Sequence, residues 1–77
     1  MERNQVVQTF TEVLGRREIT FAEGLNLVAD SELDSYDLVS IILELEELLD
    51  LSFDDDTQML FGAGDLSRIC DHISELT

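Results

Sequence analysis

Few side chains in this sequence could act as nucleophiles, acids or bases. The one histidine, His72, and the one cysteine, Cys70, are two positions apart on a predicted helix, so they do not face each other. Cys70 falls on the apolar side of that helix and His72 on the polar side, which predicts a packed thiol and a surface imidazole. No Gly-x-Ser-x-Gly turn is present to expose a serine nucleophile. We therefore predict no catalytic residues and no enzyme activity.

The many carboxylates suggest calcium binding, but their spacing does not fit an EF-hand loop. Such a loop needs oxygen ligands at positions 1, 3 and 5, glycine at position 6 and glutamate at position 12. A loop that starts at Asp30 has Ser35 at position 6 and Ile41 at position 12, and one that starts at Asp54 has Met59 at position 6. We predict no metal site.

A serine flanked by two carboxylates remains. Ser35 lies between Asp34 and Asp37 at the start of the strongest helical pattern, and Val39 and Leu43 follow near it on the helical wheel. One interpretation is an ordinary helix start, because Asp34 or Ser35 can act as the N-cap. The other is a functional serine beside an apolar strip. The helical pattern alone leaves both interpretations open.

Apolar periodicity predicts the elements that position these residues. It indicates helices over residues 3–14 and 34–51, a shorter one over residues 57–61, and a last one that begins at Asp65. Residues 62–64, Gly-Ala-Gly, are expected to end the short helix. Residues 18–32 keep no regular period and are predicted to form a long ordered loop, anchored by its apolar side chains.

The longest predicted helix has one apolar face, and no segment of the chain has a strand pattern. At about 100° per residue, the following residues share that face: Leu38, Ile41, Ile42, Leu45, Leu48 and Leu49. Glu44 falls on the opposite side, and one interpretation of Glu44, Glu46 and Glu47 is a solvated helix face. Three main helices and one short helix predict an all-α fold, a small four-helix bundle with a long ordered loop between the first and second helices.

The length of the chain limits the number of domains, and its net charge limits the partners that it can bind. The chain has 77 residues, with 18 Asp plus Glu against four Arg and no Lys, and a formal net charge of −14. A single domain over residues 1–77 is expected. Phosphate backbones and anionic membrane surfaces would repel so acidic a protein, so we expect neither nucleic acid nor membrane as a partner. The polar N-terminus predicts a cytoplasmic protein, which we expect to be a monomer.

The segment Leu33-Asp34-Ser35-Tyr36-Asp37-Leu38-Val39, with the glutamate-rich helix that continues it, resembles the acyl carrier proteins. That family has an Asp-Ser-Leu motif at the start of an acidic amphipathic helix, and the chain length, long loop and final helix also fit. Two Asp-Ser pairs occur, but only Ser35 opens the helix directly, whereas Ser31 lies a helical turn too early. The resemblance implies that Ser35 carries 4′-phosphopantetheine delivered by a phosphopantetheinyl transferase. It also implies that Asp34 helps to position the magnesium ion of the transferase.

The resemblance implies a docking face on the same helix. The expected partners are acyl or aminoacyl ligases, synthases and transferases that have basic docking patches. The residues expected to contact them are Tyr36, Asp37, Val39, Leu43, Glu46 and Glu47. The carboxylates would speed encounter through electrostatic steering. A cargo groove between the helices is predicted beside Ile42, Leu45, Met59, Leu60 and Ile69.

Departures from the family pattern bear on the pathway. Tyr36 replaces the usual leucine after the serine, Ser40 stands where an acidic residue is common, and Glu32 stands where glycine is frequent. The chain is compatible with a non-catalytic carrier of acyl or aminoacyl thioesters in a fatty-acid, polyketide, nonribosomal-peptide or other secondary pathway. The alternative function is an acidic helical interaction module that binds a basic partner without covalent modification.

Overall fold

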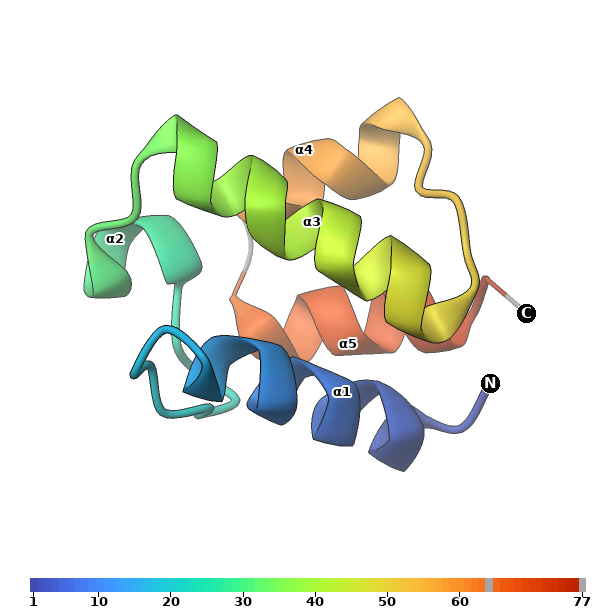
Figure 1. Cartoon of the computed structure of the whole chain (residues 1–77). Helices are drawn as coiled ribbons and strands as arrows, with labels where there is room; N and C mark the ends of the chain where they lie inside the picture. Colours follow the sequence, from blue (N-terminus) through green and yellow to red (C-terminus); the bar gives the residue numbers. More distant parts are fainter. Residues whose placement is uncertain (64, 77) are drawn as a thin grey trace.

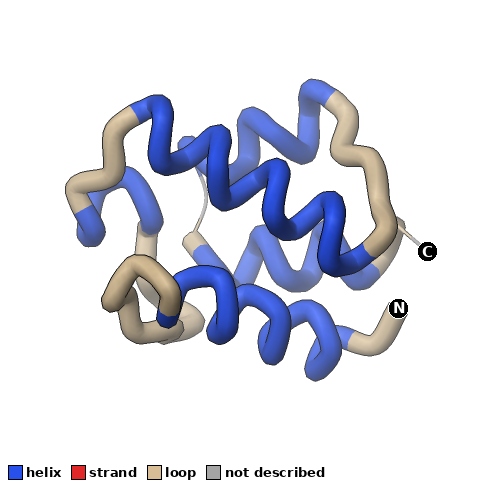
Figure 2. The backbone as a smooth tube through the Cα atoms, in the orientation of Figure 1, coloured by secondary structure: helices blue, strands red, loops and turns tan. Residues whose placement is uncertain are grey.

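The computed structural model describes residues 1–63 and 65–76, and five helices lie within these ranges. They are α1 (Arg3–Gly15), α2 (Leu27–Ser31), α3 (Ser35–Leu49), α4 (Asp55–Ala63) and α5 (Leu66–Ser74). In Figure 1, α1 and α3 run in opposite directions in front of α5 and α4, and the start of α3 lies at the end of the bundle opposite the start of α1. The described residues form no strand, and the all-α prediction is confirmed (Figure 2).

The loop predicted over residues 18–32 contains a helix that the sequence pattern missed. Asn26 begins α2 as its N-cap, since its side-chain oxygen accepts hydrogen bonds from the backbone N–H groups of Val28 (3.1 Å) and Ala29 (3.0 Å). Only Leu27 of this five-residue helix is buried. One buried residue gives no periodicity, which is why the segment resembled a loop.

The boundaries of α4 also differ from the prediction of a short helix over residues 57–61. The helix starts earlier because Asp55 and Asp56 occupy its first turn, where the positive helix end favours carboxylates. It continues through Gly62 and Ala63, where an end was expected. Gly64, the last residue of the predicted break, lies outside the described residues.

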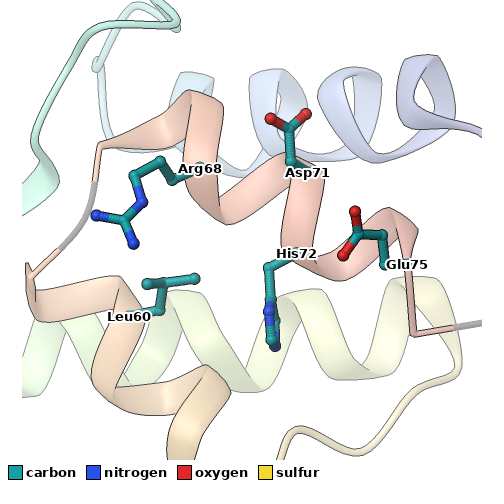
Figure 3. Close-up of a pocket in the computed structure, with 5 residues that line it drawn as sticks. All are labelled: Leu60, Arg68, Asp71, His72 and Glu75. Carbon is teal, nitrogen blue, oxygen red and sulfur yellow. The ribbon is translucent and has the colours of Figure 1, made fainter.

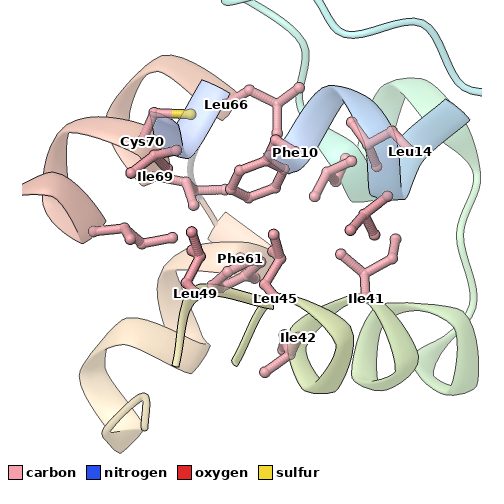
Figure 4. Packing of buried hydrophobic residues seen from close by; sticks show 14 of the residues in the cluster. Phe10, Leu14, Ile41, Ile42, Leu45, Leu49, Phe61, Leu66, Ile69 and Cys70 are labelled. Atoms are coloured by element: carbon pink, nitrogen blue, oxygen red, sulfur yellow. The ribbon is translucent and has the colours of Figure 1, made fainter. Parts of the chain in front are cut away.

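Apolar side chains from every helix meet in one core, part of which Figure 4 shows. Phe10 of α1 stacks on Phe61 of α4 with ring centroids 5.8 Å apart, and Phe53 packs against Phe61 at 5.7 Å. The predicted apolar face of α3 lies in this core except at its edges: Leu38 is half-buried and Leu48 is 47% exposed. Leu48 was therefore assigned wrongly to the core. The fully buried side chains are Val6, Phe10, Val13, Leu14, Leu27, Ile41, Leu45, Thr57, Phe61, Leu66, Ile69, Cys70 and Ile73.

The segment between α1 and α2 is fixed to the start of α5. The backbone carbonyls of Leu25 and Glu23 accept hydrogen bonds from the N–H groups of Leu66 and Ser67, both at 2.8 Å. These are two of the N–H groups that a helix start leaves without an intrahelical partner. The connection between α1 and α2 therefore supplies hydrogen-bond partners to the start of α5.

Arginines on α1 and directly after it form ion pairs with three carboxylates elsewhere in the fold. Arg3 forms ion pairs with Glu23 and with Asp71 of α5, and both carboxylates raise the pKa of its guanidinium. At the other end of the helix, Arg17 Nη1 lies 2.6 Å from Glu44 Oε2 of α3, with Arg16 3.7 Å from the same carboxylate. Glu44 is thus half-buried against α1, and its interpretation as part of a solvated helix face was wrong.

Three acidic residues hold the left-handed backbone conformation at turns after helices. Glu18 has φ 60°, Glu32 has φ 52° and Asp50 has φ 54°. A residue with a Cβ pays a steric cost in this conformation, and glycine does not. Glu32 lies three positions before Ser35, so the strain falls directly before the start of α3.

Replacing Glu32 with glycine should stabilise the fold. We expect the free energy of unfolding to rise by about 1 kcal/mol, because relief of the left-handed strain exceeds the extra chain entropy of glycine. Urea unfolding measures the change. Glu47→Gly is the matched control, since it removes the same charge from an exposed helical position and should destabilise by about 1 kcal/mol. A lower stability for Glu32→Gly than for the parent protein would contradict the strain assignment.

Candidate functional site

The start of α3 is fixed by a carboxylate cap. Asp34 is the N-cap, with extended backbone, and its Oδ1 accepts a hydrogen bond from the N–H of Asp37 at 2.8 Å. Its carbonyl accepts a further bond from the N–H of Leu38. Of the two cap candidates in the sequence, Asp34 takes the role. Ser35 is therefore the first residue of the helix, and its hydroxyl is not used for capping.

Ser35 is exposed at the positive end of α3. Within the described part of the chain, neither its hydroxyl nor the backbone N–H groups of Ser35 and Tyr36 have a hydrogen-bond partner. A phosphate attached to this hydroxyl would lie close to two free donors and the helix dipole, which together offset repulsion from Asp34 and Asp37. The donor set around Ser35 therefore fits a phosphodiester.

Ser31 offers a different environment. It is half-buried and is the last residue of α2, followed by the left-handed Glu32. Helix C-termini present carbonyl oxygens and the negative end of the dipole, which repel a phosphate. The two serines thus lie at helix ends of opposite sign, and only Ser35 lies at the end that favours an anion.

Three of the predicted docking residues form an exposed apolar stripe on α3. Tyr36 is 79% exposed, Val39 52% and Leu43 58%. We call these three residues the Tyr36 stripe. Their positions in the helix place them on neighbouring turns of one side, which begins next to Ser35.

The predicted docking carboxylates differ in their surroundings. Glu47 is exposed and Asp37 is half-exposed, and neither carboxylate has a partner among the described residues. Glu46 is half-buried, and its Oε2 accepts a hydrogen bond from the N–H of Phe53 at 2.7 Å. Glu46 therefore holds the connection between α3 and α4, in addition to any contact with a partner.

The residues named for the predicted cargo groove do not share one environment. Ile42, Leu45 and Ile69 are packed in the core, and Met59 is 71% exposed. Leu60 borders a hollow of about 280 Å³ between α4 and α5, whose other lining residues are all polar or charged (Figure 3). They are Arg68, Asp71, His72 and Glu75. The placement of Met59 on the buried side of α4 was wrong, and the groove itself stays a prediction.

A partly buried hydrogen-bond chain beside this hollow was also missed. Thr57 Oγ1 donates to Asp54 Oδ1 at 2.7 Å, which leaves its lone pairs to accept from His72 Nε2 at 2.9 Å. Asp54 Oδ1 also accepts from the N–H of Thr57, and these bonds lower the pKa of the Asp54 carboxyl. His72 is thus half-buried between α5 and α4, and the prediction of a surface imidazole was wrong. Asp54 is of a residue type that commonly caps a helix start, and this is the signal that the sequence contains.

The family model of the phosphopantetheine attachment site matches residues 4–73 of the chain. The chain belongs to this family. Proteins of this family are non-catalytic carriers in which 4′-phosphopantetheine is bound covalently to a conserved serine, and this chain is such a carrier. Carriers work with a phosphopantetheinyl transferase and with biosynthetic enzymes. No curated protein and no solved structure matches the carrier.

Two further observations describe the carrier as a whole. No helix within the described residues has the length and apolar character needed to cross a membrane. In the same residues, no group of three or more His, Cys, Asp or Glu side chains is arranged to hold a metal ion.

The hydrogen-bond chain through Thr57 should make stability depend on the charge of Asp54. The pKa of Asp54 is lowered in the folded state, so its contribution is present above the unfolded value of about 3.9 and is lost as pH falls through the folded pKa. We expect Asp54→Ala to lower the melting temperature at pH 7 and the difference from the parent carrier to shrink at about pH 3. Glu47→Ala, which removes an exposed carboxylate that has no partner among the described residues, is the control and should change the melting temperature little. Equal effects of the two substitutions at pH 7 would contradict the assignment.

Cys70 should be chemically inert in the native carrier. The side chain is buried in the core, as predicted, and this burial raises the pKa of its thiol to about 11. Because the thiolate is the reactive form, a disulfide reagent at pH 8 should modify Cys70 much more slowly in native protein than in denatured protein. Stoichiometric reaction at the same rate in both would show that Cys70 is accessible.

Proposed function

We propose that Ser35 is the attachment site of 4′-phosphopantetheine in this carrier. The observation that supports the assignment is the exposed Ser35 hydroxyl, which lies beside the unpartnered N–H groups of Ser35 and Tyr36 at the start of α3. Bound there, the prosthetic group supplies a thiol at the end of a long arm, on which cargo is carried as a thioester. The carrier itself holds the attachment point in place and supplies the surface that partners bind.

Asp34 has two roles in this proposal. Its side chain caps α3 by accepting a hydrogen bond from the N–H of Asp37, which makes Ser35 the first helical residue. The Ser35 hydroxyl is therefore not needed for capping. The Asp34 carboxylate accepts no other hydrogen bond from the described residues, so it can also take part in positioning the magnesium ion of the transferase, as the family resemblance implies.

The cargo is an acyl or aminoacyl intermediate, and the pathway is fatty-acid, polyketide, nonribosomal-peptide or other secondary biosynthesis. Tyr36, Ser40 and Glu32 depart from the common family pattern, so a dedicated pathway has at least as much support as general fatty-acid synthesis. The partners are ligases, synthases and transferases with basic patches, and the carrier works as a cytoplasmic monomer of one domain. Between Asp30 and Asp56 there are 11 acidic residues and no basic one, which supports partners of positive charge.

Intact-mass measurement tests the site. Apo carrier is incubated with coenzyme A, magnesium and a broad-specificity phosphopantetheinyl transferase, and we expect a gain of one phosphopantetheinyl group. Ser35→Ala should abolish the gain, because the accepting hydroxyl is lost, and the matched control Ser31→Ala should retain it.

The mass measurements distinguish modification at Ser35 from modification at Ser31 and from no modification. Loss of the gain in Ser31→Ala with retention in Ser35→Ala would move the site to Ser31. No gain by the parent protein with any transferase tried would contradict modification altogether and favour a non-covalent acidic interaction module.

A further inference from the structure

An exposed aromatic ring lies directly beside the proposed attachment site. Tyr36 is the most exposed of the large apolar side chains in the described residues, and its ring makes no contact with the Phe10, Phe21, Phe53 and Phe61 rings of the core. A ring left in water contributes almost nothing to folding, since stabilisation scales with the apolar area removed from water. The exposed ring of Tyr36 is therefore available to a partner.

The carboxylates along α3 differ in whether they form ion pairs. Glu44 is neutralised by Arg16 and Arg17, on the side of α3 that faces α1. The carboxylates of Asp37 and Glu47 have no ion-pair partner among the described residues. Asp37, the neighbour of Tyr36 in the chain, attracts a cation that approaches the ring, and Glu47 attracts one at the other end of α3.

We infer, building on the carrier function proposed above, that partner enzymes dock on the Tyr36 stripe through an arginine whose guanidinium lies over the Tyr36 ring. Arginine fits better than lysine because its planar, weakly hydrated guanidinium stacks on an aromatic face while its N–H groups still donate to a carboxylate. Val39 and Leu43 continue the stripe and accept the apolar part of the partner surface. Tyr36 is on this basis a specificity-determining residue, in place of the leucine that the family usually has.

The sequence makes this contact easy to observe. Tyr36 is the one tyrosine and the chain has no tryptophan, so tyrosine fluorescence and the tyrosine ring protons report on this position alone. Apo carrier is titrated at low salt with two peptides of equal length and charge, one containing arginine and the other lysine. We expect the arginine peptide to bind about two- to fivefold more tightly and to shift the Tyr36 ring protons. The preference should persist in Tyr36→Phe, which keeps the ring, and vanish in Tyr36→Leu.

A second measurement uses a partner enzyme. In the transferase reaction, Tyr36→Leu should raise the KM for the carrier about two- to fivefold with kcat unchanged, and Tyr36→Phe should match the parent. Equal affinity for the two peptides, or an unchanged KM in Tyr36→Leu, would overturn the inference. Because these results compare variants that keep Ser35, they leave the attachment proposal standing. Failure of the parent carrier to be modified would instead contradict the attachment proposal, while the peptide titration would still decide the arginine contact.

Discussion

Repulsion among carboxylates is the main physical constraint on the fold of this small domain. A net charge of −14 on 77 residues opposes a compact fold, and surface ion pairs alone return little of that free energy. The structure places much of the charge at helix N-termini, where it is favourable: Asp34 caps α3, Asp65 caps α5, and Asp54 accepts from the third residue of α4. The acidic residues are thus part of the helix starts that organise the core.

Three of the four arginines determine which side of the domain stays acidic. Arg3, Arg16 and Arg17 belong to α1 or directly follow it, and their ion pairs neutralise Glu23, Asp71, Glu12 and Glu44. The outer side of α3 has no such partners among the described residues. Its start therefore combines an exposed hydroxyl, an exposed aromatic ring and uncompensated negative charge, and these properties suit transient docking with a basic enzyme surface.

The sequence predicted long, strongly periodic elements well and short ones poorly. Both α1 and α3 were recognised because several buried residues recur at helical spacing, and Ser35 was identified because it opens α3. By contrast, α2 has a single buried residue, and its signal was the Asn26 cap alone. Periodicity also cannot give the rotation of a short helix, which is why Met59 was placed inside although it is 71% exposed.

Contacts between distant segments could not be predicted from one sequence. The hydrogen bond between His72 and Thr57 joins residues that are 15 positions apart in the sequence. The hydrogen-bonded ion pair between Glu44 and Arg17 joins residues that are 27 positions apart. The side chains of His72 and Glu44 were predicted to be exposed to solvent because a helical wheel describes one helix without its neighbours. Tertiary packing overrode that assignment in each case.

The modification state of the carrier in its own cells tests the central claim most directly. Glu32 lies between Ser31 and Ser35, so a protease that cleaves after glutamate puts the two serines on different peptides; trypsin cannot do so, since no basic residue lies between Arg17 and Arg68. Tandem mass spectrometry of this digest should place one phosphopantetheinyl group on the peptide that contains Ser35. The group on the Ser31 peptide, or unmodified protein throughout, would contradict the account.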